Sequence, residues 1–334
     1  MTEWPYKILI IGPSWVGDMV MAQSLFIALK QQHPDCLVDV LAPSWSLQLL
    51  QRMPEVNQAI AMPFGHGQFD LLGRVRFGRS LQACQYDQVI VLPNSWKSAL
   101  IPFFAGIPKR TGYIGEMRWG LLNDARQLDK DLLTMTVQRF VALADAAVSE
   151  YEFPKLSITL AQQHAVIEKF SIPDNQKVLA LCPGAEFGPA KRWPIEHFAA
   201  VARQMADKGW QVWLMGSDKD QPVTAQINVL SNQVCRDFAG QTSLAEAVDL
   251  LSLTDVVISN DSGLMHVAAA LDKPLIALYG SSDPGFTPPL HADATIINLN
   301  LDCSPCFKRD CPLGHTNCLV GIRPEQVVAA IGVN

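Results

Sequence analysis

Short runs of β-branched and other apolar residues alternate with helical patterns along this chain, and the alternation begins a second time after residue 150. Lys7–Ile11 reads as a first strand, and residues 19–31 read as the helix that follows it. Strands separated by helices in this way are typical of parallel α/β sheets. The further predicted strands cover residues 37–41, 88–92, 177–181, 210–215, 255–259 and 275–279. The sequence therefore predicts an α/β protein with two facing Rossmann-like domains and an interdomain cleft.

The length of 334 residues also favours two domains of ordinary size. We expect residues 1–155 to form the first domain and residues 156–322 the second. Residues 323–334 are expected to form a C-terminal helix that packs back on the first domain. Between the two halves, Pro154 and Pro173 indicate a linker that contains one helix.

The composition restricts the kind of partner. A content of 49% hydrophobic and 17% charged residues supports sizeable cores, and a net charge of −6 excludes a globally basic nucleic-acid binder. The apolar run that starts at Tyr6 is interrupted by Gly12 and Pro13, so it is too short to span a membrane. The acidic start Met1-Thr2-Glu3 does not resemble a secretory signal. We therefore expect a cytoplasmic protein.

The segment Asn260–His266 follows an apolar run and starts a helical pattern. The start of a helix presents unpaired N–H groups and the positive end of the helix dipole, which together favour phosphate. Gly263 allows a ligand to approach the backbone, Ser262 offers a hydroxyl, and His266 lies one turn further on the same side. The alternative is an ordinary helix capped by Asp261 or Ser262. The pattern alone leaves both interpretations open.

A second segment, Cys182–Pro194, also joins a predicted strand to a predicted helix. It contains Gly184, and Pro194 suits the first position of the helix because no N–H is needed there. Lys191 is then placed to neutralise the charge of a departing diphosphate. The alternative for the Lys191-Arg192 pair is solvated surface.

A third turn, Gly216–Asp220, follows the strand at 210–215. A carboxylate at the end of a strand is well placed to accept hydrogen bonds from ribose hydroxyls. Asp218 and Asp220 both fit this role, and a solvated turn is the alternative.

The first predicted strand leads into Gly12–Asp18. The glycines in this segment do not match the dinucleotide fingerprint, and Pro13 lacks an N–H, so we reject that interpretation. Asp18 stands at a helix start, where it can accept a proton from a hydroxyl group. Its alternative role is that of a helix N-cap.

Residues 66–126 contain eight Lys or Arg against four Asp or Glu, within a chain that is acidic overall. This excess indicates a surface that faces an anionic acceptor or a membrane, and scattered surface charge is the alternative. The residues that we expect to contact the acceptor are Asn94, Ser95, Lys97 and Arg118.

Four cysteines lie within a segment of sixteen residues near the end of the chain, namely Cys303, Cys306, Cys311 and Cys318. Such a group can bind a structural zinc ion tetrahedrally, although the spacing is not that of a common zinc finger. Reduced thiols are the alternative, and disulfides are not expected in a reducing compartment. We expect no metal or other cofactor in catalysis itself.

Together these segments resemble the ADP-heptose:lipopolysaccharide heptosyltransferases of glycosyltransferase family 9. The resemblance covers nearly the whole chain. It is carried by residues 10–19, 92–100, 102–108, 182–194, 260–270 and 286–290.

The resemblance implies the GT-B fold, with acceptor contacts on the first domain and the donor ADP-heptose on the second. It implies that Asp18 is the base, that Lys191 binds the donor phosphates, and that Asp220 binds the ribose. It also implies that Asp261, Ser262 and Gly263 line the diphosphate and the sugar. Gly184, Gly216 and His266 are the other residues that we expect at the donor site.

The implied reaction is transfer of L-glycero-D-manno-heptose, with inversion, to the first heptose of the lipopolysaccharide inner core. The implied acceptor is an anionic lipid A–Kdo–heptose, with peripheral contact at the cytoplasmic face of the inner membrane. Addition of the first or a later heptose is the nearest alternative within the family. A sugar-nucleotide epimerase and a solute-binding protein are the alternatives from other classes.

Overall fold

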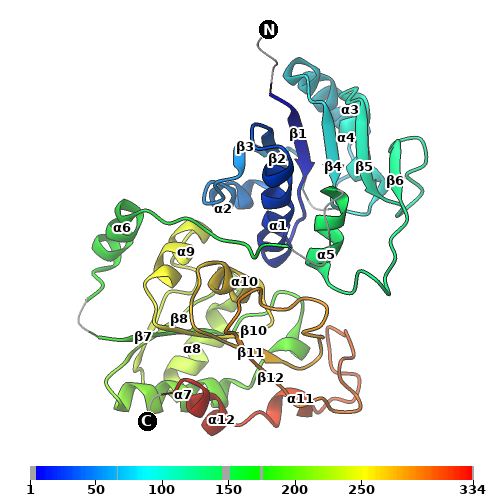
Figure 1. Ribbon diagram of the computed structural model, residues 1–334. Helices are drawn as coiled ribbons and strands as arrows, with labels where there is room; N and C mark the ends of the chain where they lie inside the picture. Colours follow the sequence, from blue (N-terminus) through cyan, green and yellow to red (C-terminus); the bar gives the residue numbers. More distant parts are fainter. Residues whose placement is uncertain (1–4, 66, 145–150, 174–175, 333–334) are drawn as a thin grey trace. The chain divides into compact units, whose positions relative to one another are not determined.

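The computed structural model describes residues 5–65, 67–144, 151–173 and 176–332. The chain forms two compact units, residues 1–154 and residues 155–334 (Figure 1). Among the helices of the described residues, none combines the length and the apolar character needed to cross a membrane.

The first unit contains a six-stranded parallel sheet with the order β3-β2-β1-β4-β5-β6. The central strand β1 pairs with β2 on one side and with β4 on the other, so the strand order reverses between β1 and β4. The strands are β1 (Lys7–Ile11), β2 (Leu37–Ala42), β3 (Val56–Ala61), β4 (Gln88–Val91), β5 (Lys109–Tyr113) and β6 (Asp124–Arg126).

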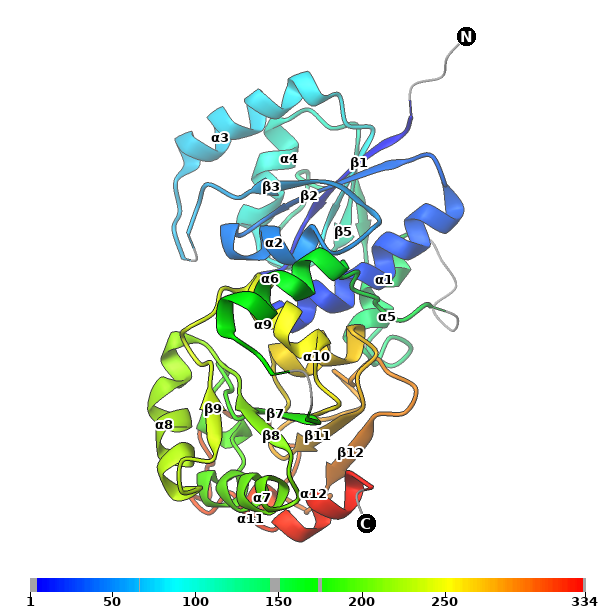
Figure 2. The same cartoon turned by 90° about the vertical axis from the view of Figure 1, so that its left-hand side faces the viewer.

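Helices cover both faces of this sheet, with α1 packed against α5 on one face and α3 against α4 on the other (Figure 2). The apolar strand residues alternate between these layers, and Leu9 and Ile11 belong to the cluster that also contains Ile101 of α4. The helices are α1 (Val16–Gln32), α2 (Leu47–Leu50), α3 (Leu71–Ser80), α4 (Leu100–Phe104) and α5 (Thr136–Val141), with 3₁₀ turns η1 (Ser44–Ser46), η2 (Leu81–Cys84), η3 (Trp96–Ala99) and η4 (Ala142–Ala144).

The second unit repeats the same strand order, β12-β11-β10-β7-β8-β9, again with every pair parallel. The reversal of order here lies between β7 and β10, where Cys182 is in register with Ser259. The strands are β7 (Val178–Cys182), β8 (Gln211–Leu214), β9 (Cys235–Asp237), β10 (Val256–Asn260), β11 (Leu275–Tyr279) and β12 (Thr295–Asn298).

In the second unit α7, α8 and α12 lie on one face of the sheet, and α9 and α10 lie on the other (Figure 1). The cluster under α7 includes Phe198 and the fully buried Trp193, whose indole N–H donates to the Ile322 carbonyl at 3.0 Å. The helices are α6 (Leu160–Phe170), α7 (Ile195–Asp207), α8 (Gln221–Leu230), α9 (Leu244–Ser252), α10 (Gly263–Ala270), α11 (Asn317–Val320) and α12 (Pro324–Ala330), with 3₁₀ turns η5 (Pro189–Lys191) and η6 (Asp218–Asp220).

The predicted α/β class with two parallel Rossmann-like sheets is confirmed. Helix α12 packs against α7 within the second unit, and the predicted return of the C-terminal helix to the first domain stays a prediction. Five strands escaped prediction, namely β3, β5, β6, β9 and β12. β6 and β9 have only three residues each, β3 and β12 contain no fully buried residue, and β5 begins with Lys109 and Arg110, so none of them has a strong apolar pattern.

Candidate active site

The predicted donor residues of the second unit gather where the strand order reverses. β7 and β10 are neighbours, and each is followed by a loop that leads into a helix, α7 or α10. In open parallel sheets, ligands bind outside the carboxyl ends of the strands at such a point. The loop after β7 carries Lys191, and the residue directly after β10 is Asp261.

Lys191 and Asp261 form an ion pair, with Nζ 2.5 Å from Oδ2. The carboxylate is almost entirely buried, and the ammonium group is partly accessible. His266 of α10 lies near both charges. Burial lowers the pKa of His266, Asp261 opposes this shift and Lys191 adds to it, so that the resulting pKa is about 4. The imidazole is therefore neutral at physiological pH, so Lys191 is the cation of this group.

The start of α10 is free of side-chain caps in the described structure. Ser262 occupies the N-cap position in an extended conformation, and its side chain makes no capping hydrogen bond. Its hydroxyl lies instead 3.2 Å from the hydroxyl of Ser259. Ser262 thus holds the N-cap position of the capped-helix alternative without the side-chain bond that would cap the helix, and the N–H groups from Gly263 onward are available to an anion.

Asn260 connects the two donor loops, a role that sequence reasoning did not assign to it. Its side chain is fully buried at the end of β10. The amide donates to the Pro183 carbonyl at 2.7 Å and accepts from the Trp193 N–H at 3.0 Å. These bonds fix both ends of the loop that carries Lys191. The only signal in the sequence was a polar residue directly before Asp261.

Gly184, Gly216 and Asp220 also meet at this edge of the sheet. The Asp220 carboxylate accepts from the backbone N–H and the hydroxyl of Ser217, at 2.9 and 2.8 Å. A Cβ on Gly184 would lie 2.6 Å from that carboxylate, and one on Gly216 would lie 2.8 Å from the Asp220 Cβ. Both glycines are therefore needed for Asp220 to lie over the strand ends. Asp218, the other candidate, is exposed.

In the first unit, Asp18 lies in the first turn of α1, close to the carboxyl end of β1. The N-cap of this helix is Trp15, so the alternative role of Asp18 as N-cap is not the one found. Asp18 is half-buried.

Asn94, Ser95 and Lys97 follow β4, the neighbour of β1. They therefore stand at the point of the first sheet where the strand order reverses, as Asp18 does. Asn94 is exposed, and its carbonyl accepts from the Glu116 N–H at 3.2 Å. Ser95 precedes η3, and Lys97 lies within it.

Arg118, which we expected to contact the acceptor, is only 2% exposed. Its guanidinium donates to the carbonyls of Pro93 and Tyr113 and to the side chain of Asn94. Burial lowers the pKa of this guanidinium, an effect that Glu116 opposes. The side chain thus holds the loops after β4 and β5 together, and this geometry indicates a positioning role.

The zinc interpretation of the cysteine-rich segment is not supported. In residues 5–65, 67–144, 151–173 and 176–332, no three Cys, His, Asp or Glu side chains gather as a metal site would require. Cys303, Cys306, Cys311 and Cys318 are free thiols. The segment packs beside the Lys191 turn instead, where the Ala190 N–H donates to the Arg309 carbonyl at 3.0 Å.

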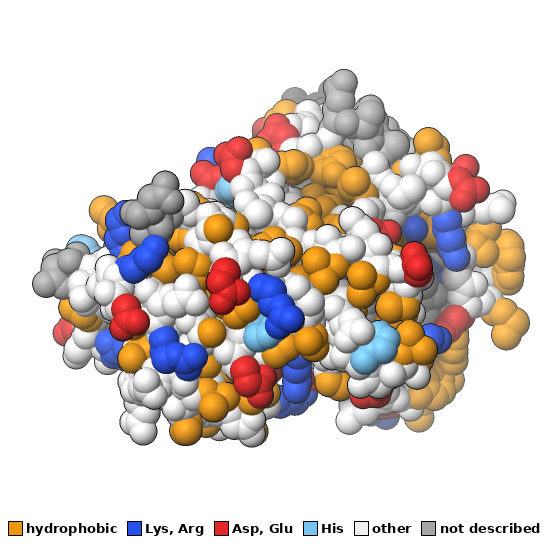
Figure 3. Space-filling view, turned by 90° about the horizontal axis from the view of Figure 1, so that it is seen from below, with side chains coloured by type: hydrophobic (Ala, Val, Ile, Leu, Met, Phe, Trp, Pro, Cys, Tyr) orange, Lys and Arg blue, Asp and Glu red, His pale blue; other side chains and the backbone are white. Residues whose placement is uncertain are grey.

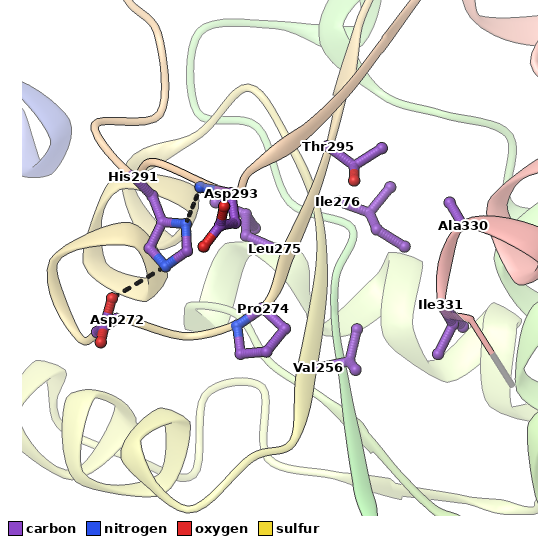
Figure 4. Close-up of a pocket in the computed structure, with 10 residues that line it drawn as sticks. All are labelled: Val256, Asp272, Pro274, Leu275, Ile276, His291, Asp293, Thr295, Ala330 and Ile331. Atoms are coloured by element: carbon purple, nitrogen blue, oxygen red, sulfur yellow. Dashed lines mark hydrogen bonds and ion pairs between the residues drawn. The ribbon is translucent and has the colours of Figure 1, made fainter.

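A cavity of about 300 Å³ lies at the opposite, amino end of β10 and β11 (Figure 4). In it, His291 Nε2 is 3.1 Å from Asp272 Oδ1, and His291 Nδ1 accepts from the Asp293 N–H. Because Lys191 and Asp261 belong to the carboxyl edge, this cavity is separate from the predicted donor site.

On the face drawn in Figure 3, basic, acidic and apolar side chains are interspersed, unlike the continuous basic surface typical of nucleic-acid binding.

Residues 74–317 match the family model described as glycosyltransferase family 9 (heptosyltransferase). The chain is 49% identical to lipopolysaccharide heptosyltransferase 2 of Salmonella typhimurium and 47% identical to that of Escherichia coli, with 96% of each chain covered in both comparisons. Its structure is similar to that of the E. coli ADP-heptose lipopolysaccharide heptosyltransferase II, with a TM-score of 0.87, 44% identity, and 98% and 97% of the two chains covered.

Proposed function

The chain belongs to glycosyltransferase family 9, the heptosyltransferases, and from this premise we propose that it transfers heptose from ADP-heptose to the inner core of lipopolysaccharide. The relatives that are nearly half identical over the full chain are named heptosyltransferase 2. This similarity favours the first heptose of the inner core as the acceptor over the alternatives within the family.

The observation that carries the donor assignment is the grouping of Lys191, Asp261 and the start of α10 at the carboxyl edge of the second sheet. Lys191 and the N–H groups of α10 supply positive charge where the diphosphate binds and where its charge increases on departure. Asp261 holds Lys191 in place. Asp220, fitted over Gly184 and Gly216, accepts the ribose hydroxyls.

Asp18 acts as the base. As the acceptor oxygen forms its bond to the anomeric carbon, the bond from that carbon to the ADP oxygen breaks, and the hydroxyl proton passes to the Asp18 carboxylate. The attack occurs on the side opposite to the leaving group, so the configuration inverts. The carboxylate does not need an unusual proton affinity, because the hydroxyl becomes acidic as its oxygen forms the new bond.

Asn94, Ser95 and Lys97 bind the acceptor beside Asp18, and Arg118 positions Asn94 through its hydrogen bond. Lys97 supplies a cation for the anionic inner core. The basic excess of residues 66–126 favours the approach of such an acceptor.

One surface of the first unit suits contact with an anionic membrane. Leu72, Arg76 and Arg79 recur at helical spacing along one face of α3 and are all exposed. Phe69, just before this helix, is 54% exposed and contacts the ring of Trp96, with 5.1 Å between centroids. Apolar side chains at one end and arginines at the other match the acyl boundary and the anionic headgroups of a bilayer.

Purified protein incubated with ADP-heptose and a series of truncated acceptors tests the function. We expect mass spectrometry to show addition of one heptose to heptosyl-Kdo₂-lipid A and none to Kdo₂-lipid A. Transfer to the heptose-free acceptor would show that the chain adds the first heptose. Conversion of ADP-heptose without any acceptor would favour an epimerase.

A further inference from the structure

The cysteine-rich loop, residues 303–318, is fastened to the carboxyl edge of the second sheet. Ser304 Oγ donates to the Gly280 carbonyl, and the Phe307 N–H donates to the Ser281 carbonyl at 2.7 Å. Both acceptors directly follow β11, the neighbour of β10. The loop therefore lies on the edge of the sheet that carries the donor residues.

The same loop is fitted closely to the turn that carries Lys191. Besides the Ala190–Arg309 hydrogen bond, Gly188 approaches the Arg309 backbone so closely that a Cβ would lie 2.5 Å from the carbonyl oxygen. Gly188 also has a φ of 156°, which is accessible essentially to glycine alone. Backbone contacts at Gly188 and Ala190 thus hold Arg309 next to this turn.

Because the loop is held against this turn, two cations lie close to the same aromatic ring. Lys191 Nζ lies 5.1 Å and the Arg309 guanidinium carbon 5.6 Å from the centroid of Phe187. Lys191 is paired with Asp261, so the charge of that pair is largely cancelled. Within the part of the chain that the structure describes, Arg309 is exposed, and its guanidinium makes neither an ion pair nor a hydrogen bond.

We propose that Arg309 is a second cation for the donor diphosphate, presented to it by the cysteine-rich loop. The inference rests on the proposed function, since it places the phosphates beside Lys191. A sugar nucleotide carries negative charge on both phosphoryl groups, and Lys191, whose charge is shared with Asp261, neutralises only part of it. The planar guanidinium matches phosphate oxygens in bidentate geometry, and its contact with Phe187 leaves its N–H groups free to make those bonds.

Calorimetric titration of Arg309→Ala with ADP, AMP and adenosine tests this role. Loss of a charged hydrogen bond is expected to weaken ADP binding about tenfold and to leave adenosine binding unchanged. Arg309→Lys should recover part of the lost affinity. The matched control is Lys308→Ala, which removes the adjacent exposed cation of the same loop and should bind ADP as the unaltered protein does.

Equal ADP affinities for Arg309→Ala and the unaltered protein would overturn the inference, as would an equal weakening of ADP and adenosine. Thermal unfolding of both variants should match that of the unaltered protein, because alanine keeps the backbone bond to Ala190. A lower melting temperature of Arg309→Ala together with an equal weakening of ADP and adenosine would assign the residue to the fold and overturn its role in phosphate binding. Failure of the unaltered protein to bind ADP would instead overturn the proposed function.

Discussion

Lys191 Nζ lies 2.5 Å from Asp261 Oδ2, although the two residues are 70 positions apart in the sequence. The carboxylate is 5% exposed and the ammonium group 17% exposed. A donor phosphate that reaches Lys191 therefore meets a cation that is already oriented by its partner. Removing one member of such a pair leaves the other charge buried and uncompensated.

Lys191→Ala is expected to abolish donor binding and to lower the free energy of unfolding by about 3 kcal/mol, because Asp261 loses its counter-ion. Lys191→Ala combined with Asp261→Asn should regain much of that stability without regaining binding. Urea unfolding and ADP titration measure the two effects. Lys219→Ala, which breaks an exposed pair with Glu186, should change neither.

Asp18→Asn is expected to lower kcat about a hundredfold or more, because the variant cannot accept the acceptor proton. ADP affinity and melting temperature should stay unchanged, since the donor binds to the second unit. Steady-state assays with a heptosylated acceptor measure the effect, and Asp35→Asn at an exposed position serves as control. A variant with normal kcat would remove Asp18 from the role of base.

Asp220→Ala is expected to weaken ADP binding about tenfold, because a carboxylate that accepts ribose hydroxyls is lost. The same substitution should not affect binding of 2′,3′-dideoxy-ADP, which has no hydroxyls to offer. Asp218→Ala is the matched control, since this carboxylate is exposed two residues away. Equal losses for both nucleotides would mean that Asp220 serves the fold of the turn alone.

Leu72→Glu is expected to reduce binding to vesicles that contain phosphatidylglycerol, because it places a negative charge at the apolar end of the α3 surface. Sedimentation with vesicles measures the bound fraction. Leu132→Glu changes a leucine of similar exposure elsewhere in the first unit and should bind normally. If both variants bind as the unaltered protein does, α3 is not the membrane surface.

Cys311 is expected to react with iodoacetamide at lower pH than an ordinary thiol. The N–H groups of residues 313–316 stabilise its thiolate and lower the pKa of Cys311, so more of the reactive form is present at neutral pH. Burial raises the pKa of Cys318, which should therefore react slowly. Mass spectrometry after timed alkylation between pH 6 and pH 9 gives both rates, and equal rates at pH 7 would contradict the assignment.

The buried strands of both sheets could be predicted, because a strand buried on both faces of a parallel sheet is a continuous run of apolar residues. The strand at 275–279 was predicted with the bounds that the structure shows. The clustering of Lys191 and Asp261 was also expected, since both follow strands that the α/β pattern brings to one edge.

Other features depend on contacts between distant segments, which a local pattern does not encode. Arg118 looked like one more surface cation, yet loop carbonyls converge on it and bury it. Residues 184 and 216 are glycines in positions where a Cβ would collide with the side chain of Asp220. The spacing of the cysteines suggested a metal site, whereas the loop is held by backbone hydrogen bonds to the Lys191 turn.

The two units share one strand order, and each sheet is complete within its own unit. Residues proposed for the nucleotide and residues proposed for the acceptor are therefore encoded in separate stretches of the gene. Substitutions that alter the choice of one substrate need not disturb the folding of the half that selects the other. Exchange of whole halves between relatives is then a direct route to enzymes with new pairs of donor and acceptor.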